Sequence, residues 1–450
     1  MDEAKTPKTP HEPHHPEQQT PDETAKANRW WHSKKAKWIT AAVITAVVII
    51  VGFLLLVVKG SNGGTPRFAP DSEGERSISE SDAVKAGKQL TNNQCQGEGV
   101  PYKLSASPMR PDEFSIIIPY GLMIGGHVTP IDHQYFSPKD YNSKPDAYEV
   151  LAMADSTIVD IGSRPRPFGK EYRLVFSVTC TFLYYYDLVT SLSPDIQKAY
   201  DQAGGDTGNR KPLNIAVKAG QKIGRIGGQT LDFAVWDTTK PLNGFVVPEH
   251  YKAESWKIFT ADPLNYYTDE LKKFILTRYV RTAQPVSGKI DYDIDGRLIG
   301  NWFLEGTNGY EGNRQAEGGA YWATHLSFAP DHLDPSWFVI SIGELADTQG
   351  TQTAQFVAQN NSPNPKDVSV DTGLVKYTLR AWSYFDKNGR DWDRNSVVNG
   401  VTIKPSLSQA SGGCVLLQMT EARKIKFELF KNKSCGAANG FSSNAKTYTR

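Results

Sequence analysis

Residues 38–58 read WITAAVITAVVIIVGFLLLVV, an uninterrupted run without a charged side chain. At about 1.5 Å of rise per residue, a helix of this length crosses the ~30 Å hydrocarbon core of a bilayer. The run ends in leucines and valines before Lys59, without a small-residue cleavage site, which argues against a removable signal peptide. The stretch therefore predicts a single transmembrane helix that divides the chain into a short tail and a large remainder.

The two flanks of this run differ in positive charge. Basic side chains crowd the segment just before it, at Arg29, Lys34, Lys35 and Lys37. The segment just after it is poorer in them, so the positive-inside rule predicts a cytoplasmic amino terminus in the cell membrane and an extracytoplasmic bulk. Residues 1–37 are rich in Pro, Glu, Thr, Lys and His, which predicts a disordered cytoplasmic tail. Residues 59–85 are typical of a linker.

The cysteines agree with an oxidising compartment. All four, Cys95, Cys180, Cys414 and Cys435, follow the apolar run. An even number on the outer side permits two disulfides, and we favour the short loop Cys414–Cys435, which leaves Cys95–Cys180. Four buried free thiols are the alternative, and none of the four has zinc-site spacing. The net charge of +1 and the lack of a basic aromatic patch give no indication of nucleic acid.

The part that follows the predicted linker is too large for one ordinary core, so we expect two domains, at 86–282 and 285–450. Both contain short apolar runs rich in β-branched and aromatic residues, separated by Gly, Pro and Asp-Gly, and the fold class is therefore mainly β. The second domain is predicted to be a β-sandwich. The predicted helices are 194–203 and 263–281, each opened by a proline.

Five motifs in the first domain follow one another in a particular order. They are GHVTPIDH at 126–133, EVLAMADSTIV at 149–159, FLYYYDL at 182–188, VKAGQKIG at 217–224 and TLDFAVW at 230–236. In order and spacing, residues 114–240 resemble the M23 (lysostaphin-like) metallopeptidase family. The resemblance implies a duplicated hybrid motif fold and a peptidoglycan-like ligand.

The resemblance also implies a zinc ion held by His, Asp and His, with two further histidines for proton transfer. Asp132 falls at the family's ligand Asp, and His127 is displaced by one residue from the ligand His. Thr230 and Asp232 replace the two histidines of the family's His-x-His strand. Asp187 replaces the histidine of its Tyr-x-His-Leu strand. Metal candidates are therefore His127, Asp132 and Asp232, while a carboxylate and a hydroxyl stand where imidazoles would titrate near neutral pH.

Three hypotheses follow. The first is a membrane-anchored, non-catalytic protein with a degenerate M23-like domain that binds cell-wall polymer or another envelope protein, without a cofactor. The second is a divergent zinc metallopeptidase that acts on a peptidoglycan-like substrate, for which zinc remains possible. The third is a structural envelope component. His133, directly after Asp132, is interpreted as a turn or surface residue and not as a ligand.

Overall fold

The computed structural model describes residues 78–97, 102–166, 169–207, 211–313, 321–346, 354–407 and 412–450. All of them belong to one compact unit of the chain. The predicted tail (1–37), the predicted transmembrane helix (38–58) and most of the predicted linker (59–85) lie outside the described residues. None of the helices in the described ranges has the length and apolar character that crossing a bilayer requires.

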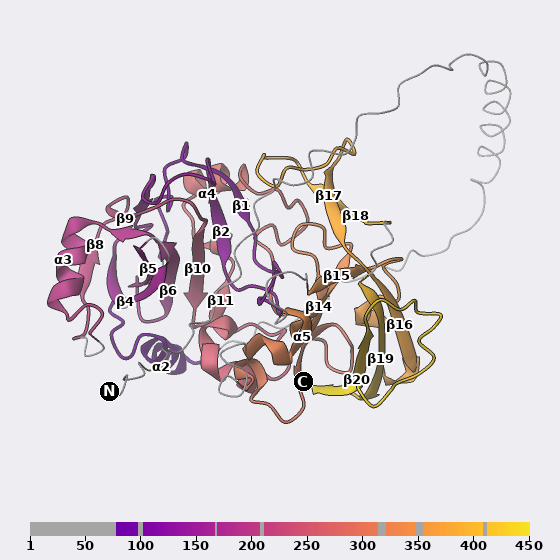
Figure 1. Cartoon of the computed structure of the whole chain (residues 1–450). Helices are drawn as coiled ribbons and strands as arrows, with labels where there is room; N and C mark the ends of the chain where they lie inside the picture. Colours follow the sequence, from indigo (N-terminus) through magenta and orange to yellow (C-terminus); the bar gives the residue numbers. More distant parts are fainter. Residues whose placement is uncertain are drawn as a thin grey trace, which may run out of the picture. The chain divides into compact units, whose positions relative to one another are not determined.

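An antiparallel sheet forms the centre of the first predicted domain (Figure 1). Its strand order is β1-β2-β10-β6-β5-β4-β8, and β11 pairs with β10. These strands are β1 Phe114–Ile118, β2 Gln134–Pro138, β4 Ser156–Arg166, β5 Gly169–Ser177, β6 Phe182–Val189, β8 Ile215–Val217, β10 Leu231–Asp237 and β11 Thr260–Ala261. A second sheet has the order β3-β9-β7, from β3 Tyr148–Leu151, β7 Ser191–Leu192 and β9 Lys222–Ile226. The mainly β fold class is confirmed.

Strand β10 lies between β2 and β6, and its side chains alternate between two apolar clusters. Leu231, Phe233 and Val235 belong to the core on one face of the sheet. Ala234 and Trp236 belong to the cluster on the other face. This alternation, the period-2 property of a strand, places Asp232 on the second face.

The helices of this half are short. They are α2 Glu80–Leu90, α3 Pro194–Gln202 and α4 Asp269–Leu276, with 3-10 helices η1 Pro248–Phe259 and η2 Pro263–Asn265. The helix predicted at 194–203 is confirmed as α3. The helix predicted at 263–281 is wrong in length, because the Asp262 side chain caps a separate 3-10 turn and α4 starts only after Thr268.

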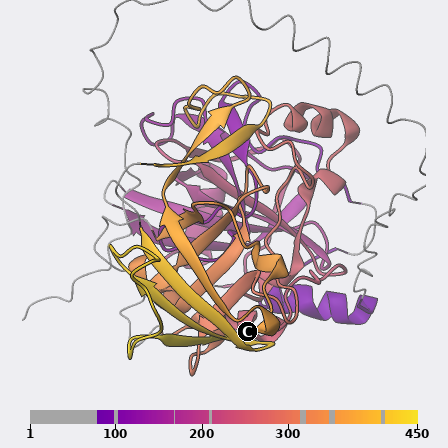
Figure 2. The ribbon, with the colours of Figure 1, turned by 90° about the vertical axis from the view of Figure 1, so that its right-hand side faces the viewer.

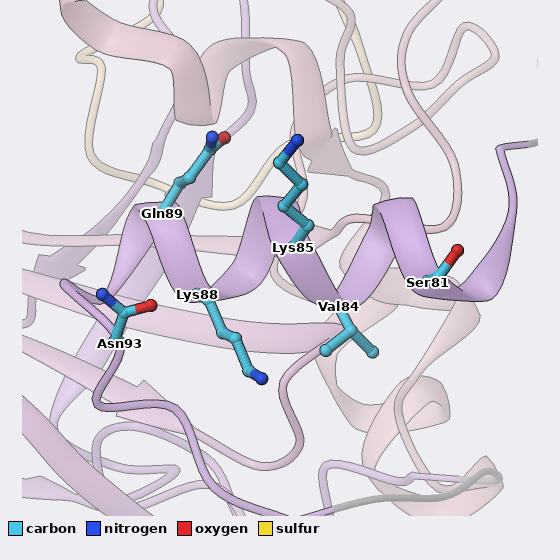
Figure 3. A pocket seen from close by; sticks show the side chains of 6 residues that line it. All are labelled: Ser81, Val84, Lys85, Lys88, Gln89 and Asn93. Carbon is cyan, nitrogen blue, oxygen red and sulfur yellow. The ribbon is translucent and has the colours of Figure 1, made fainter.

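Helix α2 begins inside the stretch predicted to be a linker, because Ser79 accepts a hydrogen bond from the Asp82 amide and so caps it. Its inner face packs closely on the loop before β6, where a Cβ on Gly87 would lie 1.7 Å from the Cys180 carbonyl oxygen. A shallow hollow beside the helix is lined by Ser81, Val84, Lys85, Lys88 and Gln89 of α2 and by Asn93 just after it, and their side chains point in different directions (Figure 3).

The second predicted domain contains a closed barrel and not the predicted sandwich (Figure 2). Around it the order is β12 Gly300–Leu304, β13 His325–Pro330, β14 Phe338–Ile342, β15 Gln355–Ala358, β16 Leu374–Arg380, β19 Gly413–Glu421, β20 Lys424–Phe430 and β21 Lys446–Thr449. Pairing of Phe303 with Thr449 helps to close the ring. In a sandwich and in a barrel alike, inward-facing and outward-facing residues alternate along each strand, so the sequence pattern does not distinguish the two folds.

Short elements surround the barrel. They are β17 Trp382–Asp386, β18 Val401–Pro405, α5 Gly343–Ala346, η3 Gly309–Glu311, η4 Tyr321–Thr324, η5 Pro365–Asp367 and η6 Val370–Thr372. One apolar cluster contains Tyr185 and Trp236 of the sheet together with Phe303 and Tyr310. Sheet and barrel segments therefore share buried surface, and the predicted domain division between 282 and 285 stays a prediction.

Both favoured disulfides are present, Cys95–Cys180 and Cys414–Cys435. The first ties the segment after α2 to the sheet, and the second lies beside the barrel strand β19. No free cysteine remains among the residues that the structure describes.

The two cross-links should differ in their contribution to stability, because Cys95–Cys180 spans 85 residues and Cys414–Cys435 spans 21. From loop-closure entropy, replacing the first pair by alanine should lower the free energy of unfolding by about 4.5 kcal/mol, and the second by about 3 kcal/mol. Urea unfolding of the two double variants measures the difference. A larger loss for Cys414–Cys435 would contradict this expectation.

Candidate functional site

One end of the main sheet brings together residues that the family resemblance singled out. Asp232 on β10 lies opposite Asp187 on β6 and opposite Tyr135 on β2. Side chains directly opposite in neighbouring strands point to the same face, so these three form one row across the sheet. Thr230, two residues before Asp232, falls on the same face by alternation. Asp187, Thr230 and Asp232 therefore converge.

The loop that precedes β2 adds Asp132 and His133 to this row. The His133 imidazole bridges two carboxylates: Nδ1 lies 3.4 Å from Asp132 Oδ1, and Nε2 lies 3.3 Å from Asp232 Oδ2. Nε2 also lies 3.1 Å from the Tyr135 hydroxyl oxygen. Since the side chain of His133 is only 12% exposed, its interpretation as a turn or surface residue is wrong. Nothing local in Pro-Ile-Asp-His reveals the distant partner Asp232.

A buried lysine completes the group on the opposite side of Asp132. Lys257 Nζ, from η1, lies 2.8 Å from Asp132 Oδ1 and 3.2 Å from Glu254 Oε2. The Trp256 indole N–H donates to Asp132 Oδ2 at 2.8 Å. Asp132 is therefore bonded through both oxygens, and its lysine partner was not predicted from the sequence. The segment around Lys257 has no motif that would have signalled it.

Burial and charge act against each other on the ion pair. Burial favours the neutral form of Asp132, but the Lys257 ammonium and the His133 imidazole outweigh it and hold the pKa of Asp132 well below its usual value. Burial likewise opposes the charge on Lys257, but Asp132 and Glu254 raise the pKa of Lys257 overall. Both partners are thus charged in the folded chain.

The other carboxylate of the His133 bridge behaves differently. Burial, reinforced by the nearby Asp187, raises the pKa of Asp232 from 3.8 to about 7, although His133 opposes the shift. Burial lowers the pKa of His133, but Asp232 and Asp132 outweigh it and raise that pKa. The Asp232 carboxyl group therefore changes charge near neutral pH.

Asp187 has a structural partner of its own. Its Oδ1 accepts hydrogen bonds from Arg164 Nη2 at 2.8 Å and from the Leu188 amide at 2.7 Å. Arg164 also contacts the buried Glu171. Asp187 therefore accepts hydrogen bonds from a side chain and from the backbone, a role that an imidazole at this position would not fill in the same way.

His127 lies at the margin of the group. It is exposed, closes a turn with Ile124 through backbone hydrogen bonds, and its ring centre lies 6.1 Å from that of His133. His127, which the sequence places one residue away from the ligand position that the resemblance implies, thus lies outside the bonded series Asp132–His133–Asp232.

The barrel half fixes the loop that carries Asp132. The Gln355 side chain on β15 pairs with the Gly125 backbone: its Oε1 accepts from the amide at 3.0 Å, and its Nε2 donates to the carbonyl at 3.1 Å. Trp322 covers Gly126 so closely that a Cβ there would lie 3.0 Å from the indole ring. Residues of the C-terminal half therefore position the site.

Two buried polar atoms of this centre have no hydrogen-bond partner within the part of the chain that the structure describes. They are Thr230 Oγ1 and Asp232 Oδ1. Thr230 is 4% exposed and Asp232 is 7% exposed. Leaving such a group unpaired costs about 1–3 kcal/mol, and more for a charged group. An unpaired acceptor retained at this cost points to a group that is supplied from outside.

The same centre does not fit the zinc ion that the family resemblance implies. Asp132, at the ligand position, already bonds the Lys257 ammonium and the Trp256 indole. A fixed ammonium at this distance repels a divalent cation. Among the described residues, no group of three or more His, Cys, Asp and Glu side chains is arranged to hold a metal.

Comparison with known proteins adds little. No family model and no curated protein matches the chain. Csd3 of Helicobacter pylori is similar over 39% of this chain and 40% of its own, with 16% identity and a TM-score of 0.22. A zinc-containing peptidase of Vibrio cholerae is similar over 37% and 39%, with 16% identity and a TM-score of 0.17. The chain spans about two fifths of each, and at these TM-scores the similarity carries no argument about fold or function.

The raised pKa of Asp232 makes stability depend on pH in a defined direction. The folded chain holds this proton more tightly than the unfolded chain, whose pKa is near 3.8, so stability falls as the pH rises toward about 7. The slope is at most about 1.4 kcal/mol per pH unit. Asp232→Asn should remove this slope and be more stable than the natural chain at pH 8.

Urea unfolding at pH 4 and pH 8 measures the effect. Asp155→Asn is the control, because Asp155 is an exposed carboxylate whose pKa is lowered by Lys218. This variant should not be more stable than the natural chain at pH 8. An Asp232→Asn chain that is less stable than the natural chain at pH 8 would contradict the prediction, because it would show that the surrounding groups stabilise the ionised carboxylate.

Proposed function

We propose that this chain is a membrane-anchored, extracytoplasmic binding protein with a degenerate M23-like domain that recognises a polymer or protein of the cell envelope. The anchor is the apolar run at 38–58. The observation that carries the binding role is the pair of unpartnered acceptors, Thr230 Oγ1 and Asp232 Oδ1, at the place where the family-like motifs converge. The two disulfides are consistent with an oxidising compartment.

The chemistry of the acceptor pair suits such a ligand. A carboxylate oxygen accepts hydrogen bonds, and a hydroxyl both donates and accepts them. Cell-wall polymers are rich in sugar hydroxyls and peptide amides, which donate them. A ligand that satisfies Asp232 Oδ1 removes the cost of a buried, unpaired oxygen, so binding is favoured by more than the new bond alone.

Hydrolysis is disfavoured by the same geometry. A catalytic zinc site needs an open position for water beside three protein ligands. Here Asp132 is engaged by Lys257, and Thr230 and Asp187 replace imidazoles, whose acid–base contribution is typically 10²–10⁴-fold. The divergent-peptidase hypothesis therefore lacks both the metal position and the proton-transfer groups of the family.

Binding to isolated envelope material tests the proposal. Full chain should co-sediment with purified peptidoglycan sacculi or with an envelope fraction, and Thr230→Val and Asp232→Ala should each weaken that binding about 10-fold or more. Thr230→Val is the sharper variant, because it removes an unpaired buried hydroxyl without changing side-chain size. Its unfolding free energy should not fall, so lost binding would not reflect lost folding.

The control variant is Asp155→Ala, which removes an exposed carboxylate on the same domain and should leave binding unchanged. Absence of binding by the natural chain to every envelope fraction would leave the structural-component hypothesis. Cleavage of peptide cross-bridges that a chelator abolishes would establish the metallopeptidase hypothesis instead.

A further inference from the structure

Lys257 occupies an unusual place for a lysine. Its side chain is 6% exposed, and its ammonium lies between the Asp132 and Glu254 carboxylates, 2.8 Å and 3.2 Å away. The centre of the Tyr310 ring lies 4.8 Å from Nζ. Fully buried lysines are rare unless they are paired, so the two carboxylates account for the burial of Lys257.

The partner of this ammonium is the residue that the family resemblance assigns to the metal. Asp132 keeps the family's ligand carboxylate, yet a cation of the protein itself lies against it at hydrogen-bond distance. The indole of Trp256, from the same 3-10 helix, binds the other oxygen. One segment, η1, thus satisfies both oxygens of Asp132.

We infer that the Lys257 ammonium is a built-in replacement for the metal ion: the residues at these motif positions are arranged around an internal ammonium and do not fit a divalent cation. This inference goes beyond the binding role and holds whether or not the acceptor pair binds a polymer. It explains how the motif positions stay assembled without zinc.

The charges around the lysine support this assignment. Facing it are the carboxylates of Asp132 and Glu254, and behind Asp132 the His133 imidazole bridges to Asp232. Removal of Lys257 leaves two carboxylates close together in a buried site without their nearest cation.

Thermal unfolding of the full chain tests the ion pair. Lys257→Met should lower the midpoint by about 5 °C or more, because it leaves a buried carboxylate uncompensated. Lys218→Met is the matched control: its Nζ lies the same 2.8 Å from the Asp155 carboxylate, but the two side chains are 80% and 64% exposed. It should shift the midpoint by no more than about 1 °C. Equal shifts for both variants would overturn the inference.

Zinc titration tests the replacement. The natural chain and Asp132→Asn should bind the same number of zinc ions, because the Lys257 ammonium already lies against Asp132. The difference between chains is the readout, because any zinc bound by His11, His14 and His15 is common to all. A natural chain that holds a zinc ion which Asp132→Asn loses would overturn the inference.

A double variant tests whether the two charges act on each other. The chain Lys257→Met/Asp132→Asn removes both charges together, so its midpoint should lie closer to that of the natural protein than the midpoint of Lys257→Met does. A double variant that loses the sum of the two single losses would show that the two charges do not interact, and would overturn the inference.

Discussion

The buried ion pair between Lys257 and Asp132 is the interaction on which the site depends. Two charges removed from water are stable only when each is bonded to the other and to further polar groups. Here the pair also contacts Glu254, Trp256 and His133, and His133 connects it to Asp232 on strand β10. The loop before β2, the 3-10 helix η1 and the end of β10 are therefore held in one place by charge.

The barrel half belongs to the same arrangement. Gln355 holds the backbone of Gly125, and Trp322 packs against Gly126, so the loop that ends in Asp132 is fixed from the C-terminal side. Tyr310 places its ring near the Lys257 ammonium. The region for which the sequence suggested no family thus has at least one role, which is to support the centre of the other half.

Much of the sheet could be predicted, because its information is local. The run 231–236 is apolar and rich in aromatic and β-branched residues, as a buried strand requires, and the alternation of a strand places Thr230 and Asp232 on one face. The disulfide pairing also followed from spacing. The closed barrel did not, because closure depends on the pairing of β12 with β21, far apart in the sequence. Lys257 and the bridging role of His133 were missed for the same reason: each is defined by a distant partner.

We propose one account for the internal ammonium and for the carboxylate and hydroxyl that stand where the resemblance implies imidazoles: the centre serves binding. Its most direct test is anomalous X-ray scattering at the zinc edge from crystals of the full chain grown with zinc. The account predicts no zinc peak within bonding distance of Asp132, and density for the Lys257 ammonium beside it. A zinc ion bonded to Asp132 and Asp232, with Lys257 turned away, would contradict it.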